Sequence, residues 1–423
     1  MNPYLAVLAI VMAAVALQVA NGLFGTFLPL RMAHAGFSPF AVGIVVTGHS
    51  VGFFIGCLTV SRLIREIGHI RAFAVFAAAA SITTLSFAML VDATMWTFLR
   101  VMLGYCSAGL FTVTESWLSD RTTAAARGRV ISFYMIFNRL SFASGQLLVA
   151  AGDIGGLGLF MIAGAAFSVS LIPIAMTRMT SPKVPAVNTM DPRELFRVAP
   201  AGVMGAVVAG ITNVAVIGLT PLYGTDLGMT PSDIAVLLAL MQVGSLLFQW
   251  PLGWLSDRID RRRVIVGISV ATAAVSGAIV AAGDGPPWLL MALFMLWGAF
   301  ALSLYAICLA HVSDHAPPDR IVVLITNLLL VWAAGSMIGP PMATGAMELM
   351  GPPGLFAYSG LSALLFAGFV GWRMTRRGPV PTDLREPFVT VPETSPAVAE
   401  LDPRGEEEPA KAEPEPAAER SPQ

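Results

Sequence analysis

The chain has 423 residues, of which 56% are hydrophobic and 12% are charged, and its mean hydropathy is +0.74. This composition excludes a water-soluble enzyme built around a single buried core, and it is typical of a protein whose helices lie in lipid. The formal net charge of −1 hides an uneven distribution, because 11 of the 26 acidic residues follow Gly378.

Runs of about 20 apolar residues, the length of a helix that crosses a bilayer, recur along the chain in two groups. The first group lies at 4–30, 40–61, 72–91, 96–118, 130–151 and 155–177, and the second at 199–223, 233–255, 264–283, 287–310, 321–345 and 354–373. They predict an all-α polytopic membrane protein with twelve transmembrane helices in two six-helix bundles. The first run has no basic N-terminal region and is too long for a signal peptide, so it is read as a retained helix.

A polar, proline-containing segment at 178–198 separates the two groups. The expected organisation is an N-terminal bundle at 1–177, a cytoplasmic central loop at 178–198, a C-terminal bundle at 199–377 and a tail at 378–423. The tail is rich in Pro, Glu and Ala and has almost no aromatic residues. Because it has too little apolar surface to offset the entropy lost on ordering, it is predicted to be disordered, acidic and cytoplasmic.

The two groups resemble each other. At a shift of 194 residues, Gly104 aligns with Gly298 and Asp120 aligns with Asp314. A shared six-helix repeat predicts two bundles related by an axis along the membrane normal, with a binding site between them.

Basic residues between the runs predict the orientation. If the N-terminus is cytoplasmic, 18 Lys and Arg residues fall in cytoplasmic connections, and Arg31 alone falls in an external one. Because basic residues are retained in short cytoplasmic loops, both termini are expected inside the cell.

A dense charge cluster, GWLSDRIDRRR, lies at Gly253–Arg263 between two apolar runs. Gly253 permits close helix approach, Asp257 caps a backbone turn, and the arginines suit anionic headgroups. The pattern G-x-x-x-D-R-x-x-R-R resembles the loop between the second and third helices of a six-helix half in the major facilitator superfamily. The alternative is a generic basic loop.

Further segments strengthen this resemblance over about residues 1–375. RVMLGYCSAG at Arg100–Gly109 is similar to the fourth-helix motif of the superfamily, and ESWLSD, GHIRAF and AHVSDHAPPDR resemble its YcaD-like branch of sugar or multidrug permeases. The fifth-helix antiporter motif is absent, since the chain has SGQLLVAAG at 144–152, which argues against drug–proton antiport.

The resemblance implies a conformational latch in the loop. Asp257 and Arg258 would form it, with the acid at the N-terminal end of the eleventh helix near Arg320 when the inner side is closed. The latch candidates are Gly253, Asp257, Arg258, Arg262 and Arg320.

Glu115 is the only acidic residue inside a predicted span, and Arg139 on the next span is its best basic partner. The two could form a structural ion pair or a gating pair, or Glu115 could carry a proton. His49 is a second titratable candidate, with a hydrogen-bonded packing role as the alternative. Arg100 either faces the protein interior or reaches the outer surface.

In the superfamily, helices 1, 4, 7 and 10 line the central path. Polar and aromatic residues on these helices and on the fifth are candidates for the substrate cavity, the alternative being that they only link helices. They are Gln18, Asn21, Thr112, Asn138, Asn213, Trp297 and Tyr305.

The expected function is secondary active transport of a small neutral or lipophilic solute by alternating access, with proton-coupled efflux as one form of it. The alternatives are a non-transporting receptor or scaffold on the same fold and a passive facilitator. No nucleophile elbow, metal-ligand cluster or nucleotide loop indicates an enzyme, a metal or a cofactor, and Cys57, Cys106 and Cys308 lie inside apolar runs. The expected partners are the substrate and the lipid bilayer, with no nucleic acid, and the expected state is a monomer in the inner membrane.

Overall fold

The computed structural model describes residues 3–122, 126–176, 182, 192–283, 285–317, 320–376, 378, 385, 388–389 and 392–401. Its first half consists of α1 (Pro3–His34), α2 (Pro39–Ile67), α3 (His69–Ser86), α4 (Ala93–Asp120), α5 (Arg127–Leu147), the 3-10 turn η2 (Leu148–Ala151) and α6 (Gly158–Ala175).

The second half begins with the short helix α7 (Pro192–Val198), which occupies the segment between the two groups of apolar runs. It continues with α8 (Pro200–Asp226), α9 (Pro231–Arg258), α10 (Arg261–Ala282), α11 (Pro287–Ala301), α12 (Leu304–Ser313), α13 (Ile321–Met350), α14 (Gly354–Met374) and the 3-10 helix η5 (Pro396–Leu401). α11 and α12 together form one span, Pro287–Ser313. α13 continues through Pro340 and Pro341.

Eleven helices in the described part of the chain are long and apolar enough to cross a membrane. The remaining predicted span is α5, whose 21 residues include Arg127, Arg129, Asn138 and Arg139. α5 nevertheless packs lengthwise against α1 and α9. Asn138 is buried and Arg139 is half-buried, whereas Arg129 near the start of the helix is exposed. The predicted all-α architecture of two six-helix bundles is confirmed.

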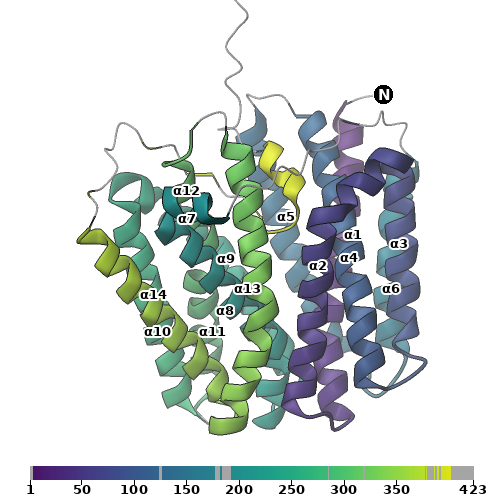
Figure 1. Cartoon of the computed structure of the whole chain (residues 1–423). Helices are drawn as coiled ribbons and strands as arrows, with labels where there is room; N and C mark the ends of the chain where they lie inside the picture. Colours follow the sequence, from purple (N-terminus) through teal and green to yellow (C-terminus); the bar gives the residue numbers. More distant parts are fainter. Residues whose placement is uncertain are drawn as a thin grey trace, which may run out of the picture.

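Chain direction alternates from helix to helix, which gives the assembly two sides (Figure 1). The side at the top of Figure 1, called the near side below, holds the N-terminus and the helix ends at Ile67, Asp120 and Arg258. The far side holds the turns that precede α2, α4, α9 and α14.

Repeat-related glycines permit the closest helix crossings in both bundles. A Cβ atom on Gly104 of α4 would lie 2.0 Å from the His49 carbonyl oxygen of α2, and one on Gly298 of α11 would lie 2.1 Å from the Met241 carbonyl oxygen of α9. Only glycine allows backbones to approach so closely. The shift that aligns Gly104 with Gly298 thus corresponds to one helix crossing made in each bundle.

The two bundles meet through α2 against α13, α5 against α9, and α1 against α8. On the far side this contact is tight. A Cβ atom on Gly43 of α2 would lie 2.8 Å from Thr344 Cγ2 of α13, and one on Gly218 of α8 would lie 2.7 Å from Val46 Cγ1 of α2. The far side of the bundle interface is therefore closed by direct helix packing.

On the near side, part of the tail lies between the bundles. Residues 392–401, called the cavity segment below, include η5, which contacts α4 and α5 of the first bundle and α13 of the second. η5 is the yellow turn near the top of Figure 1. Ala397, Val398 and Ala399 are buried there. The disorder predicted for 378–423 therefore does not extend over 392–401, because this short stretch has apolar residues that pack between the bundles; residues 402–423 lie outside the described residues.

Candidate functional site

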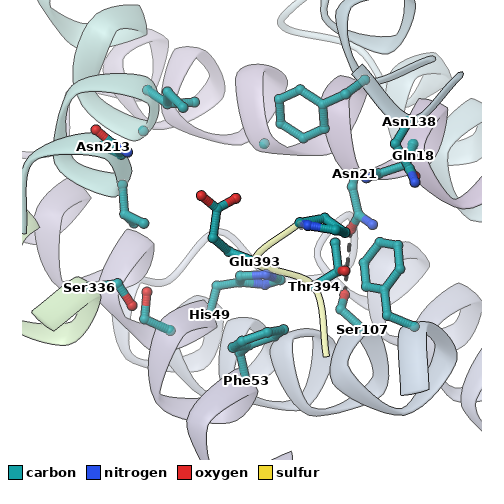
Figure 2. A pocket seen from close by; sticks show the side chains of 18 of the residues that line it. Gln18, Asn21, His49, Phe53, Ser107, Asn138, Asn213, Ser336, Glu393 and Thr394 are labelled. Atoms are coloured by element: carbon teal, nitrogen blue, oxygen red, sulfur yellow. Dashed lines mark hydrogen bonds between the residues drawn. The ribbon is translucent and has the colours of Figure 1, made fainter. Parts of the chain in front are cut away.

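A cavity of about 280 Å³ lies at the centre of the molecule, between the two bundles (Figure 2). Helices of both bundles and the cavity segment contribute to its wall. A site made by both halves is the one whose shape changes when the halves move relative to each other. The polar and charged residues that line it are Gln18, Asn21, His49, Ser50, Arg100, Ser107, Asn138, Arg139, Asn213, Gln242, Ser336, Glu393 and Thr394.

Four amide side chains that the sequence suggests for the cavity do line it. They are Gln18 and Asn21 on α1, Asn138 on α5 and Asn213 on α8. The Ser107 hydroxyl donates to Asn21 Oδ1 at 3.5 Å. Figure 2 shows Asn213 on one wall and Asn21, Gln18 and Asn138 on the other. The amides can therefore present donors and acceptors to a solute from both bundles.

Three other candidates do not line the cavity. The Thr112 hydroxyl is buried and donates to the Ala108 carbonyl of its own helix at 2.7 Å. Trp297 is fully buried in the second bundle, where its indole N–H donates to Ser359 Oγ at 3.0 Å. Tyr305 lies behind the wall, with its ring centroid 6.4 Å from that of Trp332. The Thr112 and Trp297 side chains are thus hydrogen-bonded within their own bundles, whereas Tyr305 lies beside Trp332 of the bundle interface.

Aromatic side chains form much of the remaining wall. Phe53 of α2 and Trp332 of α13 meet edge to face across the bundle interface, with ring centroids 6.2 Å apart and an interplanar angle of 82°. The other aromatic residues of the wall are Phe24, Phe111 and Phe142. Such faces suit the apolar body of a solute.

Arg100 faces the interior, which decides between the two alternatives that the sequence leaves open. Arg100 is 8% exposed, and its guanidinium carbon lies 5.8 Å from the centroid of the Phe24 ring. His49 directly follows Gly48, where an added Cβ atom would lie 3.2 Å from Arg100 Cβ, and it also lines the cavity. Arg100 Nε and His49 Nδ1 are buried and have no hydrogen-bond partner among the described residues. Both atoms are thus available to a bound solute or to water.

Glu115 is fully buried in the near half of α4. The Tyr134 hydroxyl of α5 donates to its Oε1 at 3.0 Å. The Thr394 hydroxyl also donates to Oε1, and the Ser395 hydroxyl donates to Oε2. Every described partner of this carboxylate is therefore a hydroxyl group.

The ion pair predicted between Glu115 and Arg139 is not formed in the described structure. Arg139 Nη1 donates to Gln242 Oε1 of α9 at 3.0 Å, and Arg139 Nη2 lies 3.9 Å from Glu393 Oε2. The reason is the rotation of α5: this helix turns Arg139 toward the second bundle and Tyr134 toward α4.

The tail residues at the cavity were not among the sequence candidates. Glu393 and Thr394 belong to the cavity segment and line the cavity, and the Glu393 side chain points into it (Figure 2). Burial raises the pKa of Glu393, while the positive charge of Arg139 opposes that shift. The sequence signal was PETSPAVA, an acid and two hydroxyl residues before a short apolar run, which the average composition of the tail conceals.

The charged loop holds the second set of candidates. Asp257 Oδ1 lies 3.2 Å from Arg261 Nη1, and its Oδ2 accepts a hydrogen bond from the Phe388 backbone N–H at 3.0 Å. Arg320 does not reach Asp257, because its Nη1 pairs with Glu194 Oε1 of α7 at 2.6 Å. The latch contact expected between Asp257 and Arg320 is therefore not made in this conformation.

The remaining arginines of the loop have separate partners. The Arg258 guanidinium lies over the Trp254 ring, 3.8 Å from its centroid. Arg262 Nη2 pairs with Asp260 Oδ2 at 2.8 Å. Burial alone would raise the pKa of Asp260, but the hydrogen bonds and charge of Arg262, together with His311, lower it overall.

Arg261, which is not among the latch candidates, makes the most buried ion pair of the loop. Its Nε lies 2.6 Å from Asp314 Oδ2, and the two side chains are 1% and 2% exposed. This pair ties the α9–α10 loop to the end of α12. Asp314 therefore has the pairing role that its position at a turn suggests.

A profile of the Major Facilitator Superfamily matches residues 10–223 and again residues 202–401. The chain belongs to the major facilitator superfamily. It is therefore a multi-pass membrane transport protein and not an enzyme. In the described part of this transporter, no three His, Cys, Asp or Glu residues are grouped so that they could hold a metal ion.

Relatives of this major facilitator transporter occur in enteric bacteria. The "Uncharacterized MFS-type transporter YcaD" of Escherichia fergusonii is 27% identical over 335 residues, covering 78% of this chain and 86% of the relative. The "Uncharacterized MFS-type transporter YE1530" of Yersinia enterocolitica is 26% identical over 333 residues, with the same coverage of 78% and 86%. These matches confirm the resemblance to the YcaD-like branch.

Solved structures confirm the fold. The nucleoside transporter NupG superposes with a TM-score of 0.71 at 14% identity, covering 89% of this chain and 98% of NupG. A D-xylose–proton symporter superposes with a TM-score of 0.69 at 16% identity, covering 91% and 100% of the two chains. At this level of identity, the similarity concerns architecture alone.

Proposed function

We propose that this protein is a secondary active transporter that carries a small neutral or lipophilic solute by alternating access, with the central cavity as its substrate site. The observation that carries the proposal is the wall of the cavity, which both bundles build. A relative movement of the bundles can therefore close the cavity on one side and open it on the other.

The lining suits this class of solute. Amide and hydroxyl groups from α1, α4, α5 and α8 offer hydrogen bonds, and five aromatic side chains offer apolar faces. A solute with an apolar body and a few polar groups can use both kinds of surface. Arg100 and Arg139 give the helices two positive charges at the cavity, where they can position a carbonyl or hydroxyl oxygen.

The distribution of basic residues supports a cytoplasmic near side and a bacterial inner membrane. Arg62, Arg65, Arg71 and the arginines of the α9–α10 loop lie at near-side helix ends, whereas Arg31 lies at a far-side end. With the far side closed by Gly43 against Thr344, the conformation corresponds to the inward-facing half of a transport cycle.

Glu115 is our candidate for proton coupling. Among the described carboxylates whose side chains are fully or almost fully buried, Asp314 is paired with Arg261, whereas Glu115 has only hydroxyl partners. A carboxyl group out of water and without a cation beside it is the type of group that carries protons in membrane transporters. Its position between the near side and the cavity would allow proton exchange with the cytoplasm.

The test is solute uptake into vesicles that contain the purified protein. A panel of labelled neutral solutes identifies a substrate, and Asn21→Ala and Asn213→Ala are then compared with the parent protein. Each should lower kcat/KM by about tenfold, corresponding to a lost hydrogen bond of about 1.4 kcal/mol. Asn327→Ala is the matched control, because Asn327 is a buried amide that donates to Val323 of its own helix, away from the cavity. Equal losses in all three variants would contradict the assignment of the cavity.

A further inference from the structure

The cavity segment occupies the space between the bundles on the side opposite the far-side closure. The tail that contains it contacts the rest of the molecule at two places: residues 392–401 lie at the cavity and between α4, α5 and α13, and Arg385 and Phe388 lie at the α9–α10 loop. These contacts are made by residues from the part of the chain that follows the last transmembrane helix.

At the cavity, the segment contacts the lining residue Arg139 and the buried Glu115 of α4, which does not itself line the cavity. Thr394 and Ser395 donate to the two oxygens of Glu115, and Glu393 lies 3.9 Å from Arg139. Ser395 is fully buried. The segment thus presents a carboxylate to the cationic residue of α5 and hydroxyl groups to the acidic residue of α4, as a polar solute could.

Beyond these polar contacts, the segment is held by apolar packing. Val398 and Ala399 are 2% and 0% exposed, and they belong to one core that contains side chains from both bundles. Burial of these side chains stabilises the docked segment. A peptide packed in this way separates α4 and α5 from α13 and prevents direct contact of these helices.

At the loop, a second anchor uses the residues that resemble the superfamily motif. The Phe388 N–H donates to Asp257, and the Phe388 ring covers Gly253 so closely that a Cβ atom there would lie 2.1 Å from Phe388 Cδ1. Arg385 Nη1 donates to the Ile259 carbonyl at 2.7 Å. Two of the latch candidates, Gly253 and Asp257, are therefore engaged by the tail.

We propose that the tail acts as an intramolecular plug: the cavity segment, anchored by Arg385 and Phe388, fills the cytoplasmic opening of the cavity and holds the transporter in its inward-facing state. This proposal rests on the proposed function and adds its regulation. Closing the near side requires the bundles to approach there, and the segment lies where they would meet. The plug must therefore leave before the far side can open, and it competes with solute for Arg139.

Docking of the plug can be tested without a known substrate. Val398→Cys introduces a buried thiol, whose labelling by a membrane-impermeant fluorescent maleimide is followed in inverted membrane vesicles. Labelling should be slow in the otherwise unchanged chain. The double substitution Thr394→Asp with Ser395→Asp places two carboxylates against Glu115, and the repulsion should speed labelling by about tenfold or more. Thr375→Asp, at the exposed end of α14, is the matched charge control and should have no effect. Equally fast labelling in all three proteins would show that the segment is not docked.

The second test asks whether the plug keeps the far side of the transporter closed. Thr344→Cys lies buried in the far-side contact with Gly43, so the same maleimide reaches it from outside the cell only when that side opens. A chain that ends at residue 384 should be labelled about five times faster than the full chain, because the open state becomes more populated. Met89→Cys, 85% exposed in a far-side turn, should label equally in both. Equal labelling of Thr344→Cys in the two chains would overturn the plug.

The labelling measurements and the transport measurement together separate this inference from the proposed function. If no solute is transported by either chain but both labelling differences are observed, then the plug stands and the transport proposal fails. If the truncated and full chains transport a solute at the same rate and label equally at Thr344→Cys, the transport proposal stands and the plug fails.

Discussion

Arg139 Nη1 of α5 donates a hydrogen bond to Gln242 Oε1 of α9 at 3.0 Å, and this bond crosses from the first bundle to the second. Both residues line the central cavity. A polar contact between the bundles at the depth of the central cavity stabilises one relative position of the two halves, and it must adjust when they move.

Removing this contact should destabilise the inward-facing state. Gln242→Ala is expected to lower the free energy of unfolding by about 1.5–3 kcal/mol, the range for a hydrogen bond to a charged group. Thermal unfolding of the detergent-purified protein measures this change. Gln249→Ala, at another buried position of α9, is the control, and a loss at Gln249 as large as that at Gln242 would count against the contact.

Glu115 and Arg139 should behave as independent residues in stability measurements. Because the two are not paired, Glu115→Gln does not leave the Arg139 charge without its partner, and Arg139→Gln should not rescue any loss. In the chain that ends at residue 384, which lacks the Glu393 and Thr394 contacts that couple the two residues, the double variant is expected to lose the sum of the single losses within about 0.5 kcal/mol. Recovery of stability in the double variant would indicate a direct ion pair.

Glu115 also gives a prediction for the pH dependence of transport. If Glu115 carries the coupled proton, Glu115→Gln should remove the dependence of net solute flux on pH and leave counterflow of solute intact. The measurement compares flux between pH 5.5 and about pH 8 in vesicles with and without a proton gradient. A variant whose net flux still follows the gradient would exclude Glu115 as the proton carrier.

The buried pair of Arg261 and Asp314 should be the most sensitive contact of the α9–α10 loop. Arg261→Ala removes the ion-pair partner of the buried Asp314 carboxylate and should cost about 3–5 kcal/mol of stability. Asp314→Ala should cost less, because Arg261 keeps Asp257 at 3.2 Å. Arg263→Ala in the same loop is the control, because Arg263 is exposed and a surface arginine contributes about 0–1 kcal/mol. Thermal unfolding distinguishes the two, and similar losses at Arg261 and Arg263 would refute the role of burial.

Gly253 should control docking of the tail through Phe388. Gly253→Ala places a methyl group against the Phe388 ring, and it should speed maleimide labelling of Val398→Cys by severalfold. In a Phe388→Ala background the same substitution should have no further effect, because the clashing ring is gone. Gly267→Ala on α10, where a Cβ atom meets nothing within 4 Å, should leave labelling unchanged. An effect of Gly253→Ala that persists without the ring would place its cause elsewhere.

The fold could be predicted because its determinants are spread over long segments. Apolar runs of bilayer length and the aligned residues Gly104 and Gly298 indicate two bundles without any detail of side-chain packing. Helix α5 is the exception by hydropathy, since Asn138, Arg139 and other polar residues lower its apolar character. Its run at 130–151 is nevertheless long enough to be predicted as a span.

The site could be predicted in part. Asn21 and Asn213 lie at the cavity, as their helices suggest, but Thr112 and Trp297 do not. A polar residue in a membrane helix satisfies its hydrogen bonds equally well inside a bundle, as Trp297 does with Ser359. The choice depends on the rotation of each helix, which one sequence does not contain. Rotation also explains why Arg139 meets Gln242 and Glu393 instead of Glu115.

The tail could not be placed because composition was averaged over its whole length. Eleven acidic residues suggest a solvated chain. Within it, the hydroxyl groups of Thr394 and Ser395 donate hydrogen bonds to the Glu115 carboxylate. The Val398 side chain packs in an apolar space between the helices. Such a match depends on three-dimensional neighbours that are hundreds of residues away in the sequence.

The central claim is that solute crosses the membrane through the cavity between the bundles. The most direct test is counterflow in vesicles that contain the purified chain ending at residue 384, loaded in turn with each member of a panel of small neutral and lipophilic solutes. We predict that at least one labelled solute accumulates transiently against its own unlabelled pool, and that Asn213→Ala lowers this accumulation by about tenfold. Failure of every solute to accumulate above protein-free vesicles, with the protein folded and inserted, would contradict the account.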